Sequence, residues 1–270
     1  MPIITISRGT GSGGLLLAEG IAKELNYKMV SREDVLREAA AYGAPEEELQ
    51  KALLSPPSFW DRFRHERRCH LALVQAALCE HAQHDQIVYH GNAGHLLLQA
   101  ISHVLCILIV APMPVRIQML MERQNMGRDE AIAFIEKVDR ERRAWTRFLY
   151  DVDWMDPSLY DLTLNLRTMD VARAVELAVE AARNRAFAAT EESRQAIANL
   201  ALASRVRATL AANPKTCPAE VEIDAKQGVV YLRGKVRPAS MVDAVIKAAS
   251  DVDGVQQVNR DQLAAPNYSV

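Results

Sequence analysis

Apolar residues in this chain fall into short continuous runs, separated by longer stretches in which apolar positions recur at helical spacing. The runs of strand length are Ile3–Ser7, Lys28–Val30, Gln86–Tyr89, Val104–Val110 and Tyr160–Leu166. Continuous rather than alternating runs are typical of strands covered on both faces. Helices are predicted between them at Leu15–Leu25, Asp34–Tyr42, Glu46–Leu54, Asp61–Ala82, Met113–Gln124, Arg128–Leu149 and Met169–Asn184. This alternation predicts an α/β fold with a doubly wound parallel sheet.

The pattern changes in the last third of the chain. An alanine-rich stretch of mixed charge, Arg183–Ala203, predicts a connecting helix. The order that follows it is helix, strand, strand, helix, strand, at Ser204–Ala212, Val221–Ile223, Val229–Val236, Ala239–Ser250 and Val255–Leu263. We therefore expect an α/β domain over residues 1–182, a connecting helix over 183–203 and a small α+β domain over 204–270.

Composition narrows the class of protein. Apolar residues make up 49% of the 270 and the formal net charge is -2, as in a globular protein with a core and without a strong overall field. We therefore expect no DNA or RNA partner and no membrane span, and the lack of a signal-like start predicts a cytoplasmic protein. The four cysteines form no CxxC pair, which predicts reduced, structural thiols.

A glycine-rich stretch joins the first strand to the first helix. Backbone N–H groups in such a turn, together with the helix N-terminus, attract phosphate. The candidate cofactor-binding residues are Arg8, Gly9, Thr10, Gly11, Ser12, Gly13 and Gly14. A P-loop would place a lysine and a hydroxyl residue next, but Leu15 and Leu16 stand there, and a shifted register puts Gly14 at the lysine position.

Two alternatives to a P-loop remain open. Gly9, Gly11 and Gly14 also fit the dinucleotide-binding pattern G-x-G-x-x-G, with Glu33 or Asp34 as its acidic residue, or with Arg32 for NADP. A tight strand–helix turn without any ligand is the other alternative.

Four longer stretches resemble the cytidylate kinase-like family. They read ITISRGTGSGG (Ile4–Gly14), IVYHGNAGHLL (Ile87–Leu97), LCILIVAPMPVRIQMLMER (Leu105–Arg123) and VDRERRAWTRFLYDVDWMDPSLYDLTLN (Val138–Asn165). The resemblance implies a nucleoside monophosphate kinase fold with a five-stranded parallel sheet, a P-loop and an arginine-bearing lid. It also implies ATP and Mg²⁺ as cofactors and a pyrimidine nucleoside monophosphate as the phosphate acceptor.

The resemblance implies that arginines are the catalytic groups, because phosphoryl transfer depends on positive charge around the moving phosphate. Arg140, Arg143 and Arg147 share one helix face and are the candidate catalytic residues. The candidate substrate-binding residues are Arg32, Asn92, Arg116 and Arg123. The alternative for the three catalytic candidates is a solvated face with salt bridges to neighbouring acids.

The sequence departs from the family pattern at three places. Leu15-Leu16, Ser31 and Asn92 stand where relatives carry charged residues. Each departure removes a charge worth ~1.5–3 kcal/mol in a hydrogen bond to phosphate, so turnover is expected to suffer more than binding. The alternative function is therefore a weak or inactive kinase-like sensor or scaffold.

The C-terminal part resembles a BON domain, through VVYLRGKV (Val229–Val236) and ASDVDGVQQVNRDQL (Ala249–Leu263). The resemblance allows a regulatory role, a homo-oligomer or a protein partner through this domain.

Two further features do not indicate a site. The histidines His81, His84, His90 and His95 lack the spacing of a metal site, so we predict none. The basic stretch Arg62–Arg68 suits a solvated helix.

Overall fold

The computed structural model describes residues 1–54, 64–236 and 240–264 of the chain. It divides into two compact units, and neither is one continuous segment. Of the described residues, the first unit holds those up to Asp34, Leu53 and Leu54, and all of His84–Thr190. The second unit adds helices from the first third of the chain to the residues from Glu191 onward. This division differs from the contiguous domains expected from the sequence, so those boundaries stay a prediction.

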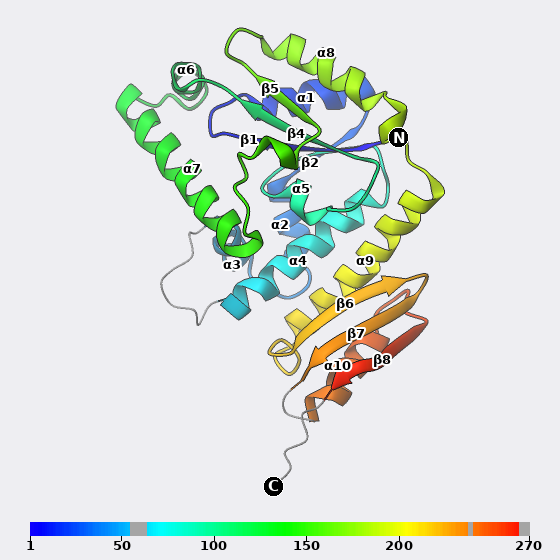
Figure 1. Cartoon of the computed structure of the whole chain (residues 1–270). Coiled ribbons are helices and arrows are strands. Elements are labelled where there is room, and N and C mark those ends of the chain that lie inside the picture. The colour runs from blue at the N-terminus through cyan, green and yellow to red at the C-terminus, as the bar shows by residue number, and fades with distance from the viewer. Residues whose placement is uncertain (55–63, 237–239, 265–270) are drawn as a thin grey trace. The chain divides into compact units, whose positions relative to one another are not determined.

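A five-stranded parallel sheet forms the centre of the first unit (Figure 1). Its strands are β1 (Ile3–Arg8), β2 (Lys28–Ser31), β3 (Ile87–His90), β4 (Val104–Val110) and β5 (Leu162–Asn165). The strand order is β2-β3-β1-β4-β5, and all four pairings are parallel. The chain crosses β1 to reach β4, which makes the carboxyl end of β1 the topological switch point where ligands bind in such sheets.

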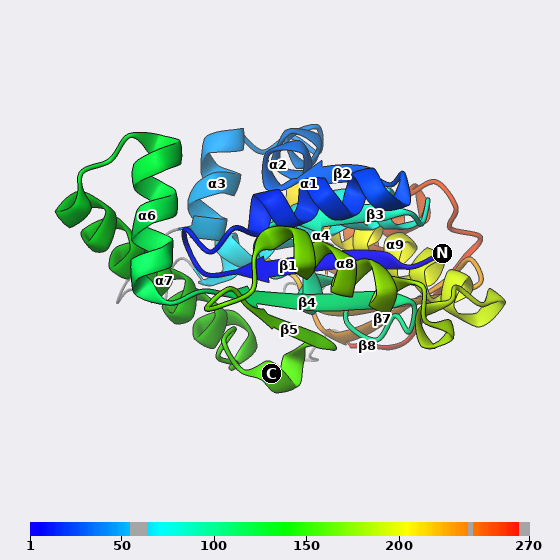
Figure 2. The same cartoon turned by 90° about the horizontal axis from the view of Figure 1, so that it is seen from above.

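Helices α1 (Gly14–Leu25) and α8 (Val171–Ala182) lie side by side on one face of this sheet (Figure 2). Their apolar faces share one core with the strands, in which Leu17, Ile21 and Ala178 are fully buried. The sheet also carries the short helix α5 (Gly94–Leu97), and a 3₁₀ turn over Pro157–Leu159 precedes β5.

Two helices of the first unit form a hairpin beyond the sheet, α6 (Met113–Gln124) and α7 (Arg128–Tyr150) (Figure 2). A separate small core joins them, made of Ile117, Leu120, Ala131 and Ile135. The hairpin corresponds to the arginine-bearing lid expected from the sequence, and α7 carries the residues that matter for the site.

Among the described residues, four helices precede the small sheet of the second unit. They are α2 (Arg32–Ala40), which the second unit shares from Val35 onward, α3 (Glu46–Leu54), which it shares up to Ala52, α4 (Arg64–Ala82) and α9 (Glu191–Ala212). Helices α4 and α9 run antiparallel along each other. Arg205 on α9 lies 2.9 Å from Glu80, and Arg207 donates to Gln75 at 3.1 Å.

The small sheet follows α9. It contains β6 (Glu220–Lys226), β7 (Val229–Lys235) and β8 (Gln257–Ala264), in that order, with α10 (Ser240–Ser250) completing the domain. The β6–β7 pair is antiparallel and the β7–β8 pair parallel. Val230, Val245 and residues of α9 form its core. The arrangement confirms the small α+β domain expected from the sequence.

The boundary between the connecting helix and the small domain differs from the expected one. The connecting helix and the first helix of the small domain are one helix, α9, which begins at Glu191 rather than Arg183; a 3₁₀ turn at Arg185–Phe187 precedes it. The side chains of the basic stretch Arg62–Arg68 lie outside the described residues. No described helix combines the length and apolar character needed to cross a membrane.

Candidate functional site

The glycine-rich loop lies between the end of β1 and the start of α1, at the switch point of the sheet. Gly11 and Gly13 have φ values of 74° and 82°, a region that L-residues with side chains rarely adopt. A Cβ on Gly11 would lie 2.8 Å from the backbone oxygen of Arg116. The loop therefore requires glycine here both for its conformation and for the close approach of α6.

Ser12 holds the loop in this shape. Its hydroxyl donates to the backbone oxygens of Gly9 at 2.7 Å and Ile109 at 3.2 Å, and the residue is 1% exposed. The Ser12 side chain thus ties the loop to itself and to β4. Its role as a cofactor-binding residue stays a prediction.

The side chain of Arg8 occupies the space beside Gly14, the position that a shifted P-loop register gives to lysine. A Cβ on Gly14 would lie only 2.2 Å from the Cδ atom of Arg8. The Nη1 atom of Arg8 is buried and has no hydrogen-bond partner among the described residues. Burial, and next the charge of Arg32, lowers the pKa of Arg8. A buried cation without an acceptor is suited to an anionic ligand.

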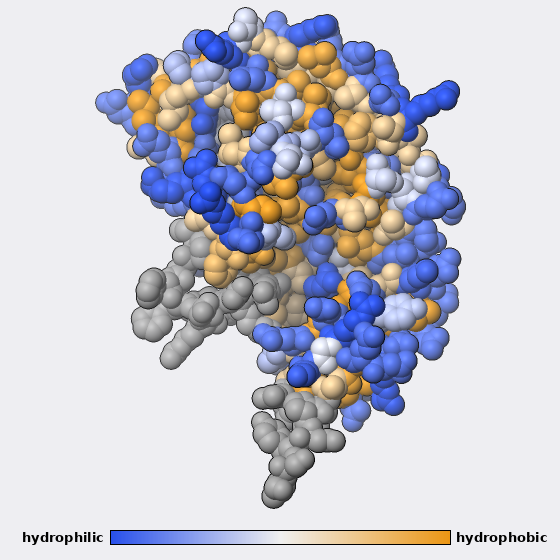
Figure 3. Space-filling model, viewed as in Figure 1, coloured by the Kyte–Doolittle hydropathy of each residue, from blue (hydrophilic) through white to orange (hydrophobic). Residues whose placement is uncertain are grey.

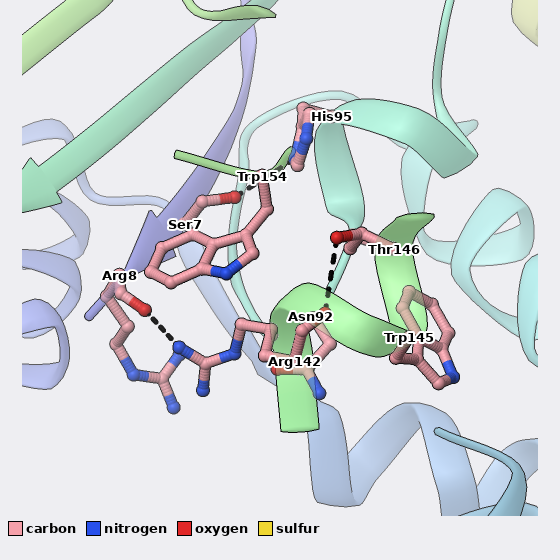
Figure 4. Close-up of a pocket in the computed structure, with 10 residues that line it drawn as sticks. Ser7, Arg8, Asn92, His95, Arg142, Trp145, Thr146 and Trp154 are labelled. Carbon is pink, nitrogen blue, oxygen red and sulfur yellow. Dashed lines mark hydrogen bonds between the residues drawn. The ribbon is translucent and has the colours of Figure 1, made fainter. Parts of the chain in front are cut away.

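Arg142 and Arg116 bring two further guanidinium groups to the loop. Arg142 on α7 donates to the backbone oxygen of Arg8 and lies over the indole of Trp154, 5.1 Å from the ring centroid (Figure 4). Burial, and then the charge of Arg8, lowers the pKa of Arg142 to about 10. Arg116 on α6 donates from Nε to the backbone oxygen of Thr10 at 2.7 Å. Three arginines thus surround one loop.

A carboxylate also binds this loop. Asp139 on α7 accepts hydrogen bonds from the backbone N–H of Thr10 at 3.0 Å and from its hydroxyl at 2.8 Å. The same carboxylate forms an ion pair with Arg116 and lies 3.8 Å from Arg142. An internal anion therefore contacts the groups that would otherwise bind the oxygens of a phosphate.

A small cavity lies beside the loop at the carboxyl ends of β1 and β3 (Figure 4). Its volume is about 10 Å³, enough for about one water molecule. Its lining residues are Ser7, Arg8, Gly91, Asn92, Ala93, His95, Arg142, Trp145, Thr146 and Trp154. A nucleotide does not fit this space, and three of the ten lining residues, Arg142, Trp145 and Thr146, come from α7.

Two histidines at this edge of the sheet are held neutral. Burial, followed by the charge of Arg8, lowers the pKa of His90 to about 4, and neither ring nitrogen has a hydrogen-bond partner among the described residues. Burial also lowers the pKa of His95 to about 4, but its ring is bonded to Ser7 at 3.0 Å and lies 3.3 Å from the Tyr160 hydroxyl. His95 is thus part of the packing, whereas the buried ring of His90 has no such bonds among the described residues.

The residues predicted to be catalytic lie on another face of α7. Arg140 is exposed, while Arg143 and Arg147 pair with Asp153 at 3.2 and 3.4 Å. Hydrophilic side chains cover the outer side of this helix (Figure 3). The structure brings Arg142 to the loop instead of these three. Their catalytic role stays a prediction that needs a movement of the lid.

The predicted substrate-binding residues divide in the same way. Arg116 contacts the loop and Asn92 lines the cavity. Arg32 pairs with Glu33, and Arg123 is exposed at the end of α6. Sequence reasoning missed Arg142, although it stands three residues after Asp139 within the stretch that resembles the family most closely.

Two departures from the family pattern have structural roles. Leu16 lines a groove between α1 and α8, as do Val171 and Val175. The Ser31 hydroxyl donates to Asp34 at 2.6 Å and accepts from the Asp34 backbone N–H at 3.1 Å, which caps the start of α2. Within the described residues, no group of three or more His, Cys, Asp or Glu side chains could hold a metal ion.

Comparisons with known proteins agree with this geometry. The chain is 26% identical over 179 residues to a cytidylate kinase of Ignicoccus hospitalis, covering 65% of this chain and 96% of that protein. It is 30% identical over 179 residues to a cytidylate kinase of Desulfurococcus amylolyticus, covering 64% and 89%. A solved structure of an uncharacterized protein from Eubacterium ventriosum matches with a TM-score of 0.52 and 20% identity, covering 68% of this chain and all of that one, which shows the shared fold.

Family models match two parts of the chain. The BON domain matches residues 198–266, which include the small sheet and most of α9. The cytidylate kinase-like family matches residues 3–168, which include all five strands of the large sheet and the α6–α7 hairpin. The chain therefore belongs to the cytidylate kinase-like family and carries a BON domain after it.

Proposed function

We propose that the protein binds ATP at its glycine-rich loop and transfers phosphate from it to a pyrimidine nucleoside monophosphate. The observation that carries the proposal is the convergence of Arg8, Arg116 and Arg142 on a backbone loop at the switch point. Guanidinium groups stabilise the charge that spreads over phosphate oxygens during transfer. Family membership supports a nucleotide-kinase-like phosphotransferase, and the pyrimidine acceptor is the finer part of the proposal.

The residues of the loop fit the phosphates of ATP. The Nη1 atom of Arg8 is buried and has no hydrogen-bond partner among the described residues, and the backbone N–H of Thr10 belongs to a loop that needs glycine at positions 11 and 13. Arg8 would take the part that lysine has in a P-loop, because its side chain fills the space next to Gly14. ATP would supply the phosphate that these groups orient and neutralise.

The loop fits Mg²⁺ less well. The hydroxyl of Ser12 is engaged by two backbone oxygens, and the position for a P-loop hydroxyl is Leu15 or Leu16. The carboxylate of Asp139 is paired with Arg116. The loop therefore offers no ready ligand for the ion.

Turnover with pure protein tests the proposal. We expect a nucleoside diphosphate when the protein is incubated with ATP, magnesium and CMP or UMP. Arg142→Gln should reduce the rate at least tenfold, since a charge-assisted hydrogen bond is worth ~1.5–3 kcal/mol. Arg173→Gln, which changes an exposed arginine on α8, is the matched control and should retain the rate. No diphosphate above a no-enzyme background, with contaminating kinase excluded, would overturn phosphate transfer.

A nucleotide sensor or scaffold is the second candidate. The observation that favours it is the closed state of the site, in which Asp139 is bonded to Thr10 and the adjoining cavity holds about 10 Å³. Calorimetry combined with the turnover assay separates the two candidates, because a sensor binds ATP without turnover. Its signal would pass to the BON domain, the part through which a protein partner or a second copy would act. Absence of binding to any nucleotide contradicts both candidates.

A further inference from the structure

Two cysteines that are distant in the sequence meet in the second unit. Cys69 lies in α4 and Cys217 in the turn between α9 and β6, 148 positions further along the chain. Their Sγ atoms are 2.7 Å apart, and both side chains are half-buried. Because a disulfide bond is about 2.05 Å long, only a small shift separates the two thiols from bond formation.

The register of the two helices supports this meeting independently. Gln75 contacts Arg207, and Glu80 contacts Arg205, so residue numbers fall along α9 as they rise along α4. In this antiparallel register, residues nearer the start of α4 lie opposite residues nearer the end of α9 at Ala212. The first residues of α4 therefore lie opposite the turn that follows α9 and holds Cys217. The pairing of the helices therefore directs Cys69 to this turn without reference to the sulfur atoms.

The turn itself is firmly built. The backbone N–H groups of Thr216 and Cys217 both donate to the oxygen of Asn213, at 2.9 and 2.7 Å. The Thr216 hydroxyl donates to the oxygen of Leu210 at 2.7 Å, and the residue is 1% exposed. These bonds fix the turn to the end of α9, which holds the sulfur of Cys217 near α4.

The other two cysteines are poor competitors for oxidation. Burial raises the pKa of Cys79 to about 12 and the pKa of Cys106 to about 11. The thiolate is the form that reacts, and these two groups supply little of it at neutral pH. Oxidation should therefore be selective within the chain.

We propose that Cys69 and Cys217 form a dithiol–disulfide site that is oxidised by low-molecular-weight disulfides such as glutathione disulfide. One cysteine thiolate attacks the disulfide and releases one glutathione thiolate, which leaves a mixed disulfide. The second cysteine thiolate then attacks the protein sulfur, forms the Cys69–Cys217 bond and releases the second glutathione thiolate. Two electrons pass to glutathione, and the two cysteine protons end on its thiols.

The bond would join the two family segments of the chain covalently. Cys69 lies within the part matched by the cytidylate kinase-like family and Cys217 within the part matched by the BON domain. Closing so long a loop restricts the unfolded chain. Oxidation should thus raise the thermal midpoint of the second unit and fasten its BON domain to α4.

Counting thiols in the full chain tests the proposal. After incubation with glutathione disulfide and denaturation, reaction with a chromogenic thiol reagent should fall from four thiols to two. Peptide mapping should find Cys69 joined to Cys217 in the wild-type protein, a result that requires no variant to fold. Cys69→Ser and Cys217→Ser should form no internal bridge, whereas the control Cys106→Ala should still lose two thiols.

Three outcomes would overturn the proposal. The first is that all four thiols remain at an oxidant concentration that modifies a small free thiol. The second is a disulfide bond that includes Cys79 or Cys106. The third is disulfide bonds that form only between two chains, as a non-reducing gel would show. None of them bears on nucleotide binding, so the proposal stands or falls separately from the function proposed above.

Discussion

The carboxylate of Asp139 lies against the backbone N–H and the hydroxyl of Thr10, at 3.0 and 2.8 Å. Thr10 is part of the glycine-rich loop, and Asp139 is part of α7 in the lid hairpin. The contact ties the lid to the loop through the donors that a phosphate needs. An entering nucleotide must therefore displace Asp139 before it reaches the amide of Thr10.

Replacing Asp139 should strengthen nucleotide binding. Asp139→Asn removes the charge that competes with phosphate and frees Arg116, so we expect ATP to bind about tenfold more tightly, as the loss of a ~1.5 kcal/mol charge-assisted bond implies. Isothermal titration calorimetry measures the affinity directly. Glu136→Gln is the matched control, because it removes a carboxylate from an exposed position of the same helix. An unchanged or weaker affinity in Asp139→Asn would show that this carboxylate does not compete with the ligand.

Arg8 should contribute to binding through its position beside Gly14. Arg8→Gln removes a guanidinium whose buried Nη1 atom has no hydrogen-bond partner in the described part of the chain, so ATP affinity should fall at least tenfold. Gly14→Ala should have the same effect, since the added methyl group would collide with the Cδ atom of Arg8 at 2.2 Å. The losses of ATP affinity should not add when the two substitutions are combined, because both act through the guanidinium of Arg8.

A second glycine provides the control for this experiment. Gly127 precedes α7, and a Cβ on it meets no atom within 4 Å, so Gly127→Ala should leave ATP affinity unchanged. If Gly14→Ala binds ATP as the wild type does while Arg8→Gln loses affinity, Arg8 acts from a different position than the one described. Fully additive losses would lead to the same conclusion.

Periodicity predicted the strands and most helices because buried parallel strands leave continuous apolar runs. Local geometry also predicted the loop, since closely spaced glycines between a strand and a helix are typical of a turn with positive φ values, as Gly11 and Gly13 have. The sequence did not predict which arginine of the lid contacts the loop. Arg140, Arg143 and Arg147 share a face, but which face turns to the loop depends on the packing of α6 against α7.

A signal for the face that turns to the loop was present in the sequence. Spacings of three and four residues place Asp139 and Arg142 in line with the apolar contact face of α7. The residues in this line are Ala131, Ile135, Asp139, Arg142 and Thr146. A charged pair on an apolar stripe indicates a buried role. The meeting of Cys69 with Cys217 left no such trace, because no local pattern links residues 148 positions apart.

Ser12 should matter more for stability than its size suggests. Ser12→Ala removes the hydroxyl that bonds the oxygens of Gly9 and Ile109, and a lost buried hydrogen bond costs about 1–2 kcal/mol. Urea denaturation followed by tryptophan fluorescence measures this, since Trp145 and Trp154 are buried in the first unit. Ser158→Ala, at an exposed position, is the control and should leave the midpoint in place. If Ser12→Ala and Ser158→Ala had the same urea midpoint, the Ser12 hydroxyl would not hold the loop.

Stability of the first unit should fall on acidification because of His95. Its pKa is about 4 in the folded protein and near 6.5 when unfolded, so between these values the unfolded chain binds more protons than the folded one. The free energy of unfolding therefore rises with pH through this window and decreases as pH falls below about 6.5. The contribution lost at pH 5 is on the order of 2 kcal/mol.

The variant His95→Gln isolates this effect. Glutamine cannot be protonated, so the decline in urea midpoint between pH 7 and pH 5 should be smaller than in the wild-type protein. Carboxylates and His90 remain in both proteins, which makes the difference between the two pH profiles the quantity of interest. His84→Gln, at an exposed position, is the control and should follow the wild-type profile. Parallel profiles for His95→Gln and wild type would contradict the neutral, buried state of His95, because a group whose pKa is the same in both states adds no slope.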